Sequence, residues 1–408
     1  MIRFDVLIVG GGLNGLAMAL ALGGKACRRP LKVGVVEKGD PRWFADPAHD
    51  SRATALTAAS IAMLQAMGAW PAMAGLTQPM RKVIVTDGKS PEARPPLLSF
   101  LNEGEMAPAV FFENHVIFKA LLEQIEASPS ISILTGQAVA RFSFGPGLAS
   151  LVLENGQELK AALIIGSDGR GSPARQAAGI GLDRWPYEQS AITLTVGHEL
   201  PHDGCAEEHF NPDGVFAILP LSGNRSSLVW TEPHEKAKAL CALPDAEFLG
   251  ELSSRFGSHR GRLSLLTPHH AYPLAMQLAK SFTAPRLALI GDAAHVVHPL
   301  AGLGLNLGFK DSAALADCVM EASALGQDIG GGAVLEAYER WRRFDTLTTA
   351  AMMHGLHGLF ANNNESLRLL RDAGLRMVDK IAPLKRLFQQ EASGLGGALP
   401  RLMRGLAA

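Results

Sequence analysis

The sequence is poor in cysteine and has no excess of charge of either sign. Its four cysteines are widely scattered and form no C-x-x-C pair, which excludes a disulfide framework and a cysteine-based zinc site and fits a reducing compartment. The 38 basic and 39 acidic residues leave a net charge of −1, whereas a dedicated nucleic-acid binder carries a basic excess. We therefore expect no nucleic-acid partner. A chain with 47% hydrophobic residues and no repeat is also neither disordered nor fibrous.

The sequence also lacks a clear membrane span. Only the run from Val6 to Gly24 has the length of one, and its interior contains Gly10, Gly12 and Asn14. Arg3 is the only basic residue ahead of this run, whereas a signal peptide begins with a basic segment and ends with a small-residue cleavage site. A buried strand, a tight turn and a buried helix explain the run better, so we expect a soluble or peripheral protein.

The turn inside this run has the glycine pattern of a dinucleotide-binding site. Gly10 permits the tight turn, Gly12 lets a pyrophosphate approach the backbone, and Gly15 lets the helix pack closely on the strand. The helix N-terminus offers free N–H groups to the phosphates. Glu37 ends the next predicted strand, 22 residues after Gly15, where a carboxylate can accept both ribose hydroxyls. The alternative is a tight turn with an unrelated glutamate. The combination of a strand, a helix and a correctly spaced acid favours the dinucleotide site over this alternative.

Two kinds of predicted strand follow one another along the chain. Short buried runs typical of parallel strands occur at 4–9, 32–36, 163–166 and 286–291, and stretches typical of an antiparallel sheet occur at 191–196, 215–220 and 226–230. Helices are expected over 13–22, over 114–127 with Asn114 as the N-cap, over 304–320, and throughout the chain beyond Leu335. This order predicts a nucleotide-binding domain in three pieces, residues 1–75, 110–180 and 280–340. Residues 76–109 and 181–279 would form an inserted substrate domain, and 341–408 a C-terminal helical segment.

Two further motifs follow predicted strands. The stretch 166–175 contains Asp168 and Gly169 directly after a strand, which alone could be only a turn. Asp292 ends a later strand, and glycines up to Gly304 precede a helix whose N-terminal N–H groups could stabilise negative charge on a ring system. A glycine-rich loop with a helix cap is the alternative for this third motif.

Together, in this order and spacing, the three motifs resemble those of the group A flavoprotein monooxygenases, the para-hydroxybenzoate hydroxylase type. The resemblance implies an α/β (α+β) fold with a Rossmann-like FAD-binding domain, an inserted antiparallel-sheet substrate domain and a C-terminal helical segment. It also implies that FAD is bound by the three motifs and by an arginine near the isoalloxazine. The residues to which it assigns FAD contact are Gly10, Gly12, Leu13, Asn14, Gly15, Glu37, Lys38, Arg52, Asp168, Gly169, Asp292, Gly302, Gly304, Leu305 and Asn306.

Stretches along nearly the whole chain are similar to the ubiquinone-biosynthesis hydroxylases, in particular the 2-polyprenyl-6-methoxyphenol hydroxylase subgroup. These stretches include residues 50–56, 187–198, 219–230, 272–274 and 338–343. Many relatives have glutamine where this chain has Leu303, which removes a polar side chain beside the flavin. The resemblance implies hydroxylation of a polyprenylated phenol with O₂ and NAD(P)H, through a C4a-hydroperoxide of the flavin.

The catalytic groups are less clearly marked than the cofactor groups. A phenol has a reference pKa of about 10, so a positioned base would help the reaction. Tyr272 is a candidate proton relay and Pro299, which begins the loop beside the flavin ring, is a second candidate. The alternative for Tyr272 is a ring that only packs, and His295 and His298 are expected to be structural. The histidines show no i, i+4 pair with a third ligand, so no metal site is expected.

The implied substrate indicates where in the cell the protein works. A polyprenyl tail adds about 4 kcal/mol of hydrophobic transfer energy per five-carbon unit. We therefore expect a cytoplasmic protein that is peripheral at the inner membrane. Residues 365–408 are a candidate contact with the membrane or with a quinone-biosynthesis complex, and closure of the core is the alternative for them. Two other functions stay open: a flavin hydroxylase or epoxidase of another aromatic or terpenoid substrate, and a non-catalytic flavin-binding subunit of a quinone-biosynthesis complex.

Overall fold

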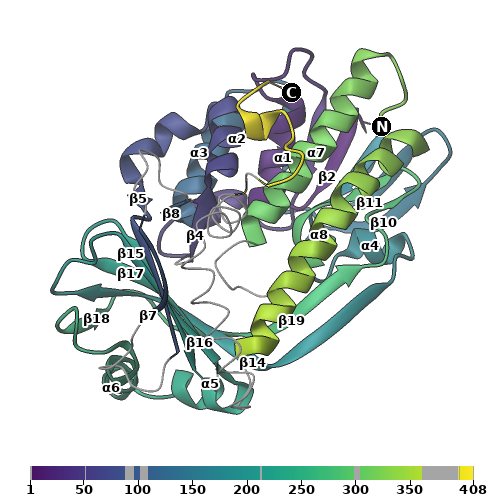
Figure 1. Ribbon diagram of the computed structural model, residues 1–408. Coiled ribbons are helices and arrows are strands. Elements are labelled where there is room, and N and C mark those ends of the chain that lie inside the picture. The colour runs from purple at the N-terminus through teal and green to yellow at the C-terminus, as the bar shows by residue number, and fades with distance from the viewer. Residues whose placement is uncertain are drawn as a thin grey trace.

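Two large sheets organise the protein. The computed structural model describes residues 2–50, 52–87, 96–101, 109–211, 214–297, 304–360, 394 and 396–407. One sheet is mostly parallel and six-stranded, and the other is mostly antiparallel and nine-stranded; they occupy different halves of the molecule in Figure 1. The predicted mixed α/β class with an inserted antiparallel sheet is confirmed.

The six-stranded sheet is made of short aliphatic runs that are buried on both faces, which is typical of parallel strands. In spatial order its strands are β20 (Thr283–Ala284), β21 (Leu287–Leu289), β13 (Leu163–Gly166), β2 (Val6–Val9), β3 (Val33–Val36) and β9 (Ile131–Leu134). All neighbours pair in parallel except β20 and β21. The carboxyl ends of the parallel strands therefore meet at one edge, which is where ligands bind in open α/β sheets.

Helices cover this sheet. Every residue of α1 (Leu13–Gly23) except Asn14 is buried, as its alanine- and leucine-rich sequence predicts. α1 packs against α7 (Gly304–Ala324) and α3 (Asn114–Glu126). α8 (Gly332–Phe360) packs on α7 and then runs on toward the nine-stranded sheet, so it reaches both halves of the molecule (Figure 1).

The start of α3 differs from the prediction. Glu113, and not Asn114, occupies the N-cap position, and no side chain caps this helix. The Oδ1 atom of Asn114 instead accepts a hydrogen bond from the Oγ1 of Thr54, 2.7 Å away in β4 (Ala53–Thr57). The expected cap was wrong because a tertiary partner takes the asparagine side chain.

The nine-stranded sheet contains the inserted antiparallel strands. Its strands are β22 (His295–Val296), β19 (His270–Ala279), β14 (Leu182–His198), β17 (Arg225–Pro233), β16 (Gly214–Leu221), β15 (Cys205–Asn211), β6 (Lys82–Asp87) and β7 (Pro96–Leu101), with β18 (Leu263–Leu265) paired to β14. Only β15 and β6 pair in parallel. β22 lies within the third motif, just after the turn at 291–294, so this sheet is joined to the edge of the six-stranded sheet.

Smaller elements complete the described chain. Two further sheets contain β1 (Ile2–Arg3), β12 (Glu158–Ala161), β11 (Ala149–Leu153) and β10 (Val139–Phe144) in one, and β4, β8 (Ala109–Glu113) and β5 (Gln78–Pro79) in the other. The remaining helices are α2 (Ala58–Ala66), α4 (Pro173–Ala177), α5 (His234–Cys241) and α6 (Asp245–Phe256), with 3₁₀ turns η1 (Pro41–Ala45), η2 (Trp70–Ala72), η3 (Ala74–Leu76), η4 (Gly291–Ala293) and η6 (Leu402–Arg404).

The two faces of the nine-stranded sheet have different neighbours. On one face, Phe216 and Trp230 belong to an apolar cluster that α5 and α6 complete. On the other face, Ala191 clusters with Val297, which follows β22, and with Ala350 of α8. This second face is therefore the one that looks toward the edge of the six-stranded sheet.

The C-terminal part is less helical than predicted. The helical prediction is confirmed for 335–360, which lies in α8, and is wrong for 396–407, where η6 is the only helical turn. Glycines at 396 and 397 and Pro400 explain the difference, because both residue types disfavour helix. Most of the predicted 341–408 segment after residue 360 lies outside the described residues. Among the described helices, none combines the length and the apolar character needed to cross a bilayer.

Arg286, next to β21, connects the six-stranded sheet to the loops that contain Pro146, Ala162 and Asp328. Its guanidinium is buried and donates to the carbonyl oxygens of Pro146 (2.6 Å) and Ala162 (3.3 Å), and it forms an ion pair with Asp328. We expect Arg286→Ala to lower the free energy of unfolding by about 2–4 kcal/mol, because buried carbonyls lose their donors. Urea denaturation of both proteins measures the difference.

Arg262 provides the matched control. It also pairs with a carboxylate, Glu199, but its side chain is 91% exposed. Arg262→Ala should change the same free energy by less than about 1 kcal/mol. Equal losses in the two variants would contradict the role given to Arg286.

Candidate functional site

The three motifs meet at the carboxyl edge of the six-stranded sheet. β2, β3, β13 and β21 are neighbours there, and the chain leaves them at Gly10, Glu37, Ser167 and Ile290. Backbone hydrogen bonds continue past the strand ends, from Gly10 N–H to the Val36 carbonyl (2.9 Å) and from Ser167 N–H to the Val9 carbonyl (2.8 Å). The backbone that carries the site is therefore held by the sheet itself.

The first motif forms a tight turn with one open side. Gly10 has φ +106°, and a Cβ at this position would lie 2.2 Å from the carbonyl oxygen of Ser167. A Cβ at Gly15 would lie 1.9 Å from the carbonyl oxygen of Gly10, so the predicted close packing at Gly15 is confirmed. At Gly12, which is the N-cap of α1, no described atom lies within 4 Å of the Cβ position. The turn thus leaves space at the helix N-terminus, where a phosphate group is favoured.

Glu37 lies beside this turn. Its Oε2 atom accepts a hydrogen bond from the Gly11 N–H, and its Oε1 atom accepts one from the Gly39 N–H at 3.0 Å. The carboxylate is half-buried and close to the open side of the turn, while Lys38 points to solvent. An acceptor in this place can serve ribose hydroxyls.

The second motif is fixed to the third by an arginine. Asp168 accepts hydrogen bonds from the Ser172 hydroxyl and, at 2.9 Å, from the Ala174 N–H, so it stabilises the start of α4. Burial raises the pKa of Asp168, against the lowering effect of these hydrogen bonds. Arg175 is buried and donates to the carbonyl oxygen of Ala293, 2.7 Å away. Gly169 follows Asp168 in the loop before α4.

Asp292 is the exposed acid of the third motif. Its side chain is 49% exposed, and its Oδ2 atom lies 3.5 Å from the Nε of Arg170. Gly291, one residue earlier, has φ +57°, and a Cβ there would lie 2.4 Å from the Nδ2 of Asn14. The first and third motifs therefore touch through Asn14 and Gly291, and Asp292 projects from the point of contact.

Arg52 lies between the third motif and the nine-stranded sheet. Its Nε and Nη2 atoms donate to the carboxylate of Asp50 at 2.8 Å and 2.7 Å, and its own N–H donates to the same carboxylate. The hydrogen bond to Asp50 raises the pKa of Arg52; burial opposes this shift, and the charges of Asp50, Tyr272 and Asp292 add to it. The buried Asp50 was missed as a site residue, although its position two residues before the arginine was the available signal.

Asn306 uses its side chain inside the protein. Its Nδ2 atom donates to the carbonyl oxygen of Ala55 (2.7 Å), and its Oδ1 atom accepts from the Thr57 N–H (2.9 Å). It thereby attaches the first turn of α7, which begins at Gly304 and Leu305, to β4. Pro299, Gly302, Leu303 and His298 lie outside the described residues.

The two candidate titratable groups have different surroundings. Tyr272 is 43% exposed and lies opposite Ala191 on the face that looks toward the six-stranded sheet. His295 is buried, and its Nε2 atom lies 2.6 Å from the Oδ2 of Asp311. His295 is thus paired with a carboxylate inside the protein, while Tyr272 stays available to a ligand.

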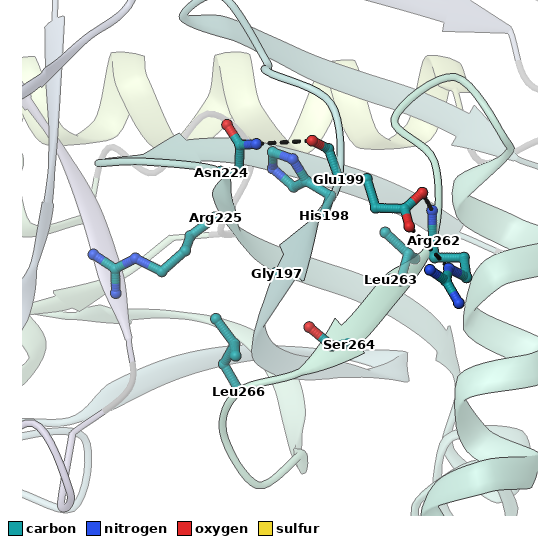
Figure 2. Close-up of a pocket in the computed structure, with 9 residues that line it drawn as sticks. All are labelled: Gly197, His198, Glu199, Asn224, Arg225, Arg262, Leu263, Ser264 and Leu266. Atoms are coloured by element: carbon teal, nitrogen blue, oxygen red, sulfur yellow. Dashed lines mark hydrogen bonds and ion pairs between the residues drawn. The ribbon is translucent and has the colours of Figure 1, made fainter.

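A groove of about 490 Å³ lies at the far end of β14 (Figure 2). Its lining residues are Gly197, His198, Glu199, Asn224, Arg225, Arg262, Leu263, Ser264 and Leu266. Both arginines in it are paired: Arg262 with Glu199 at 2.8 Å, and Arg225 with Glu113 at 3.0 Å. None of the residues of the three motifs lines this groove, so it is not the nucleotide site.

The residues at the edge of the six-stranded sheet fit a dinucleotide. The space at Gly12 suits a pyrophosphate, and the Oδ1 atom of Asn14 is buried without a hydrogen-bond partner in the described structure. Glu37, which is bonded to the Gly11 N–H, and the half-exposed Asp292, which follows the glycine packed against Asn14, add acceptors at the same edge. For metals, the described residues contain no group of three or more His, Cys, Asp or Glu side chains that could bind an ion.

An open parallel sheet with a glycine turn, a following acid and two further motifs at the same edge defines a Rossmann-like dinucleotide-binding protein. Residues 3–346 match the FAD binding domain family, and the chain belongs to this family. The predicted family and cofactor are therefore confirmed.

Similar proteins extend over almost the whole chain. Ubiquinone hydroxylase UbiL of Rhodospirillum rubrum is 41% identical over 98% of this chain and 93% of its own length. The 3-demethoxyubiquinol 3-hydroxylase of Escherichia coli is 33% identical, with 96% of this chain and 98% of the relative covered. Among solved structures, p-nitrophenol 4-monooxygenase PnpA from Pseudomonas putida superposes with a TM-score of 0.80 at 20% identity, covering 97% and 99% of the two chains. This last likeness confirms the fold.

Proposed function

We propose that the protein hydroxylates the aromatic ring of a polyprenylated phenol in ubiquinone biosynthesis, as an FAD-dependent monooxygenase that uses O₂ and NAD(P)H. The observation that supports this most strongly is the extent of the similarity to ubiquinone hydroxylase UbiL, which covers 98% of the chain. It includes the nine-stranded sheet as well as the FAD-binding edge, whereas fold alone does not define a substrate.

FAD would lie along the carboxyl edge of the six-stranded sheet. The turn from Gly10 to Gly15 and the N-terminus of α1 would bind its pyrophosphate, and Glu37 its ribose. Asp292 would contact the ribityl-phosphate region, and Arg52 would lie near the ring system. When bound, FAD supplies the redox chemistry that reduces O₂ and transfers one oxygen atom to the aromatic ring.

The protein's own part in the reaction is to orient the phenol and to move its proton. Tyr272 projects from the face of β19 that looks toward the FAD-binding edge, within electrostatic reach of Arg52. A cation in this place stabilises a nearby phenolate by Coulomb attraction. We infer that the Tyr272 hydroxyl takes up the proton of the substrate hydroxyl as it passes its own proton to solvent, while Arg52, held by Asp50, stabilises the negative charge on the substrate oxygen.

Tyr272→Phe tests this relay. We expect hydroxylation at pH 7 to fall by roughly 10²-fold with unchanged FAD content, because the substrate hydroxyl loses its proton acceptor. The rate should recover toward the wild-type value near pH 10, where a free phenol ionises in solution. Product formation is measured between pH 7 and pH 10 by chromatography. A variant with the wild-type rate at pH 7 would exclude the relay.

The proposed substrate also places the protein at a membrane surface. A polyprenyl tail costs about 4 kcal/mol per five-carbon unit to move into water, so the enzyme would meet its substrate at the bilayer. We propose a cytoplasmic location, peripheral at the inner membrane, with the C-terminal segment 365–408 and a quinone-biosynthesis complex as candidate contacts.

Deletion of the gene tests the function. The mutant strain should accumulate a polyprenylated phenol that lacks one ring hydroxyl, and its ubiquinone should fall; mass spectrometry of lipid extracts measures both. Re-expression of the wild-type protein should reverse the accumulation. Normal ubiquinone in the deletion strain would exclude the proposal. Accumulation together with FAD-loaded protein that shows no substrate-stimulated NAD(P)H oxidation in the reconstituted complex would instead identify a non-catalytic subunit.

A further inference from the structure

Asp311 is a fully buried carboxylate at the junction of three structural elements. It belongs to α7 and is 0% exposed. Its Oδ2 atom accepts hydrogen bonds from the Gly291 N–H at 3.0 Å and from the Nε2 of His295 at 2.6 Å, and its Oδ1 atom accepts one from the Nε of Arg342 at 2.8 Å. Gly291 begins the third motif, His295 lies in β22, and Arg342 lies in α8.

Two of the three partners of Asp311, the Gly291 N–H and the Arg342 guanidinium, can act only as donors, so the site favours an ionised carboxylate. An N–H group and a guanidinium can only donate, and the Nε2 of His295 carries the hydrogen because a carboxylate only accepts. Burial alone would raise the pKa of Asp311, but the charges of His295 and Arg342 and their hydrogen bonds keep it below its usual value. Arg342 is paired in turn with Asp345, which also binds Lys310 at 2.9 Å. The four charged side chains of α7 and α8 thus neutralise one another.

The turn at 291–294, which Asp311 holds, is also in contact with the first and second motifs. Gly291 is in the left-handed region and packs against Asn14 of the first motif. Arg175 of the second motif donates to the carbonyl oxygen of Ala293 at the end of the same turn. Asp292 lies between these fixed points and projects outward. The position of Asp292 therefore depends on the hydrogen bond from Gly291 to Asp311 and on the contacts of the turn with the first and second motifs.

We propose that Asp311 is a positioning residue for FAD, and that Arg342 makes α8 part of the FAD site although this helix carries none of the three motifs. Asp311 acts through the Gly291 N–H, which sets where Asp292 points, and Arg342 supplies the buried charge that keeps Asp311 ionised. Further along α8, Ala350 packs against the cluster on the nine-stranded sheet that contains Ala191. One helix therefore connects the FAD turn with the face proposed to bind substrate. The inference depends on FAD binding only and not on the identity of the substrate.

Asp311→Asn is the informative variant because it keeps the size and removes the charge. If the amide oxygen faces Gly291 and His295, the NH₂ group faces the guanidinium of Arg342, and two donors oppose each other. If the amide is flipped, its NH₂ group opposes the Gly291 N–H instead. One of the two contacts is therefore lost in either orientation. We expect the Kd for FAD, measured by quenching of flavin fluorescence on titration of the apoprotein, to rise at least tenfold.

Glu339→Gln is the matched control on the same helix. Glu339 also fastens α8 to the sheet, by accepting from the Ser281 hydroxyl at 2.9 Å and the Thr283 hydroxyl at 2.6 Å, but it does not contact the third motif. Both substitutions should lower the Tm of the apoprotein, and only Asp311→Asn should change the Kd for FAD by more than twofold. An unchanged Kd in Asp311→Asn, or an equal rise in Glu339→Gln, would overturn the proposal.

Hydrogen exchange on the wild-type protein tests the same coupling if Asp311→Asn fails to fold. Addition of FAD to the apoprotein should slow amide exchange in α8 around residues 338–346 as well as in the turn 291–294. Exchange in α6, on the far face of the nine-stranded sheet, should not change. Protection of the turn without protection of α8 would show that α8 is not part of the FAD site.

Discussion

Gly12→Val is expected to yield a folded protein that purifies without FAD. Gly12 has φ −71° and ψ 177°, an extended conformation that any residue adopts. Its Cβ position meets no described atom within 4 Å, so the protein itself has room for the valine. The valine methyl groups would fill the space that the pyrophosphate needs at the N-terminus of α1. We expect FAD content, measured from the visible absorbance after purification, below a tenth of the wild-type value, and an apoprotein Tm within about 2 °C.

Two other glycines make this result specific. Gly250 lies in α6, and its Cβ position is equally free of described neighbours, so Gly250→Val should keep both its FAD and its Tm. Gly15→Val should not fold, because its Cβ would lie 1.9 Å from the carbonyl oxygen of Gly10. A yellow, fully loaded Gly12→Val protein would show that the pyrophosphate does not lie at this turn.

The strands and helices around the FAD site could be predicted from sequence because their signals are local. Val6–Val9 and Val33–Val36 are short apolar runs bounded by glycine or charged residues, and Leu163–Gly166 is a similar run that ends in a glycine. A strand buried on both faces needs no other pattern. The glycine turn could be predicted for a similar reason, since the positive φ of Gly10 and the contact of Gly15 with the Gly10 carbonyl both arise within one βα unit. FAD contact by the individual motif residues stays a prediction.

Side-chain partners could not be predicted because they are set by tertiary packing. Asn114 has the composition of a helix cap, yet its amide oxygen binds Thr54 across the neighbouring strand. Asn306, in the glycine-rich third motif, uses both ends of its amide on the backbone of β4, about 250 residues earlier in the chain. The pairing of Asp311 with Arg342 is equally invisible in sequence, because neither residue lies in a local pattern that names the other.

Asp292→Ala should also leave the protein colourless, for a different physical reason. Asp292 is the exposed acid at the meeting point of the three motifs, and its carboxylate would accept hydrogen bonds from the ribityl hydroxyls of FAD. Loss of a hydrogen bond to a charged group costs about 1.5–3 kcal/mol, which raises the Kd for FAD by roughly 10- to 150-fold. Titration of the apoprotein with FAD measures this change. Asp292→Asn, which keeps an acceptor oxygen, should lose less.

Arg170→Ala separates this role from the ion pair that Asp292 makes. The Nε of Arg170 lies 3.5 Å from the Asp292 carboxylate, and both side chains are about half exposed, so the pair itself contributes less than about 1 kcal/mol to stability. If Asp292 serves FAD directly, Arg170→Ala should change the Kd for FAD by less than fivefold, far less than Asp292→Ala. If the two variants weaken FAD binding equally, Asp292 acts only by holding Arg170, and the ribityl contact must be made by another residue at this edge.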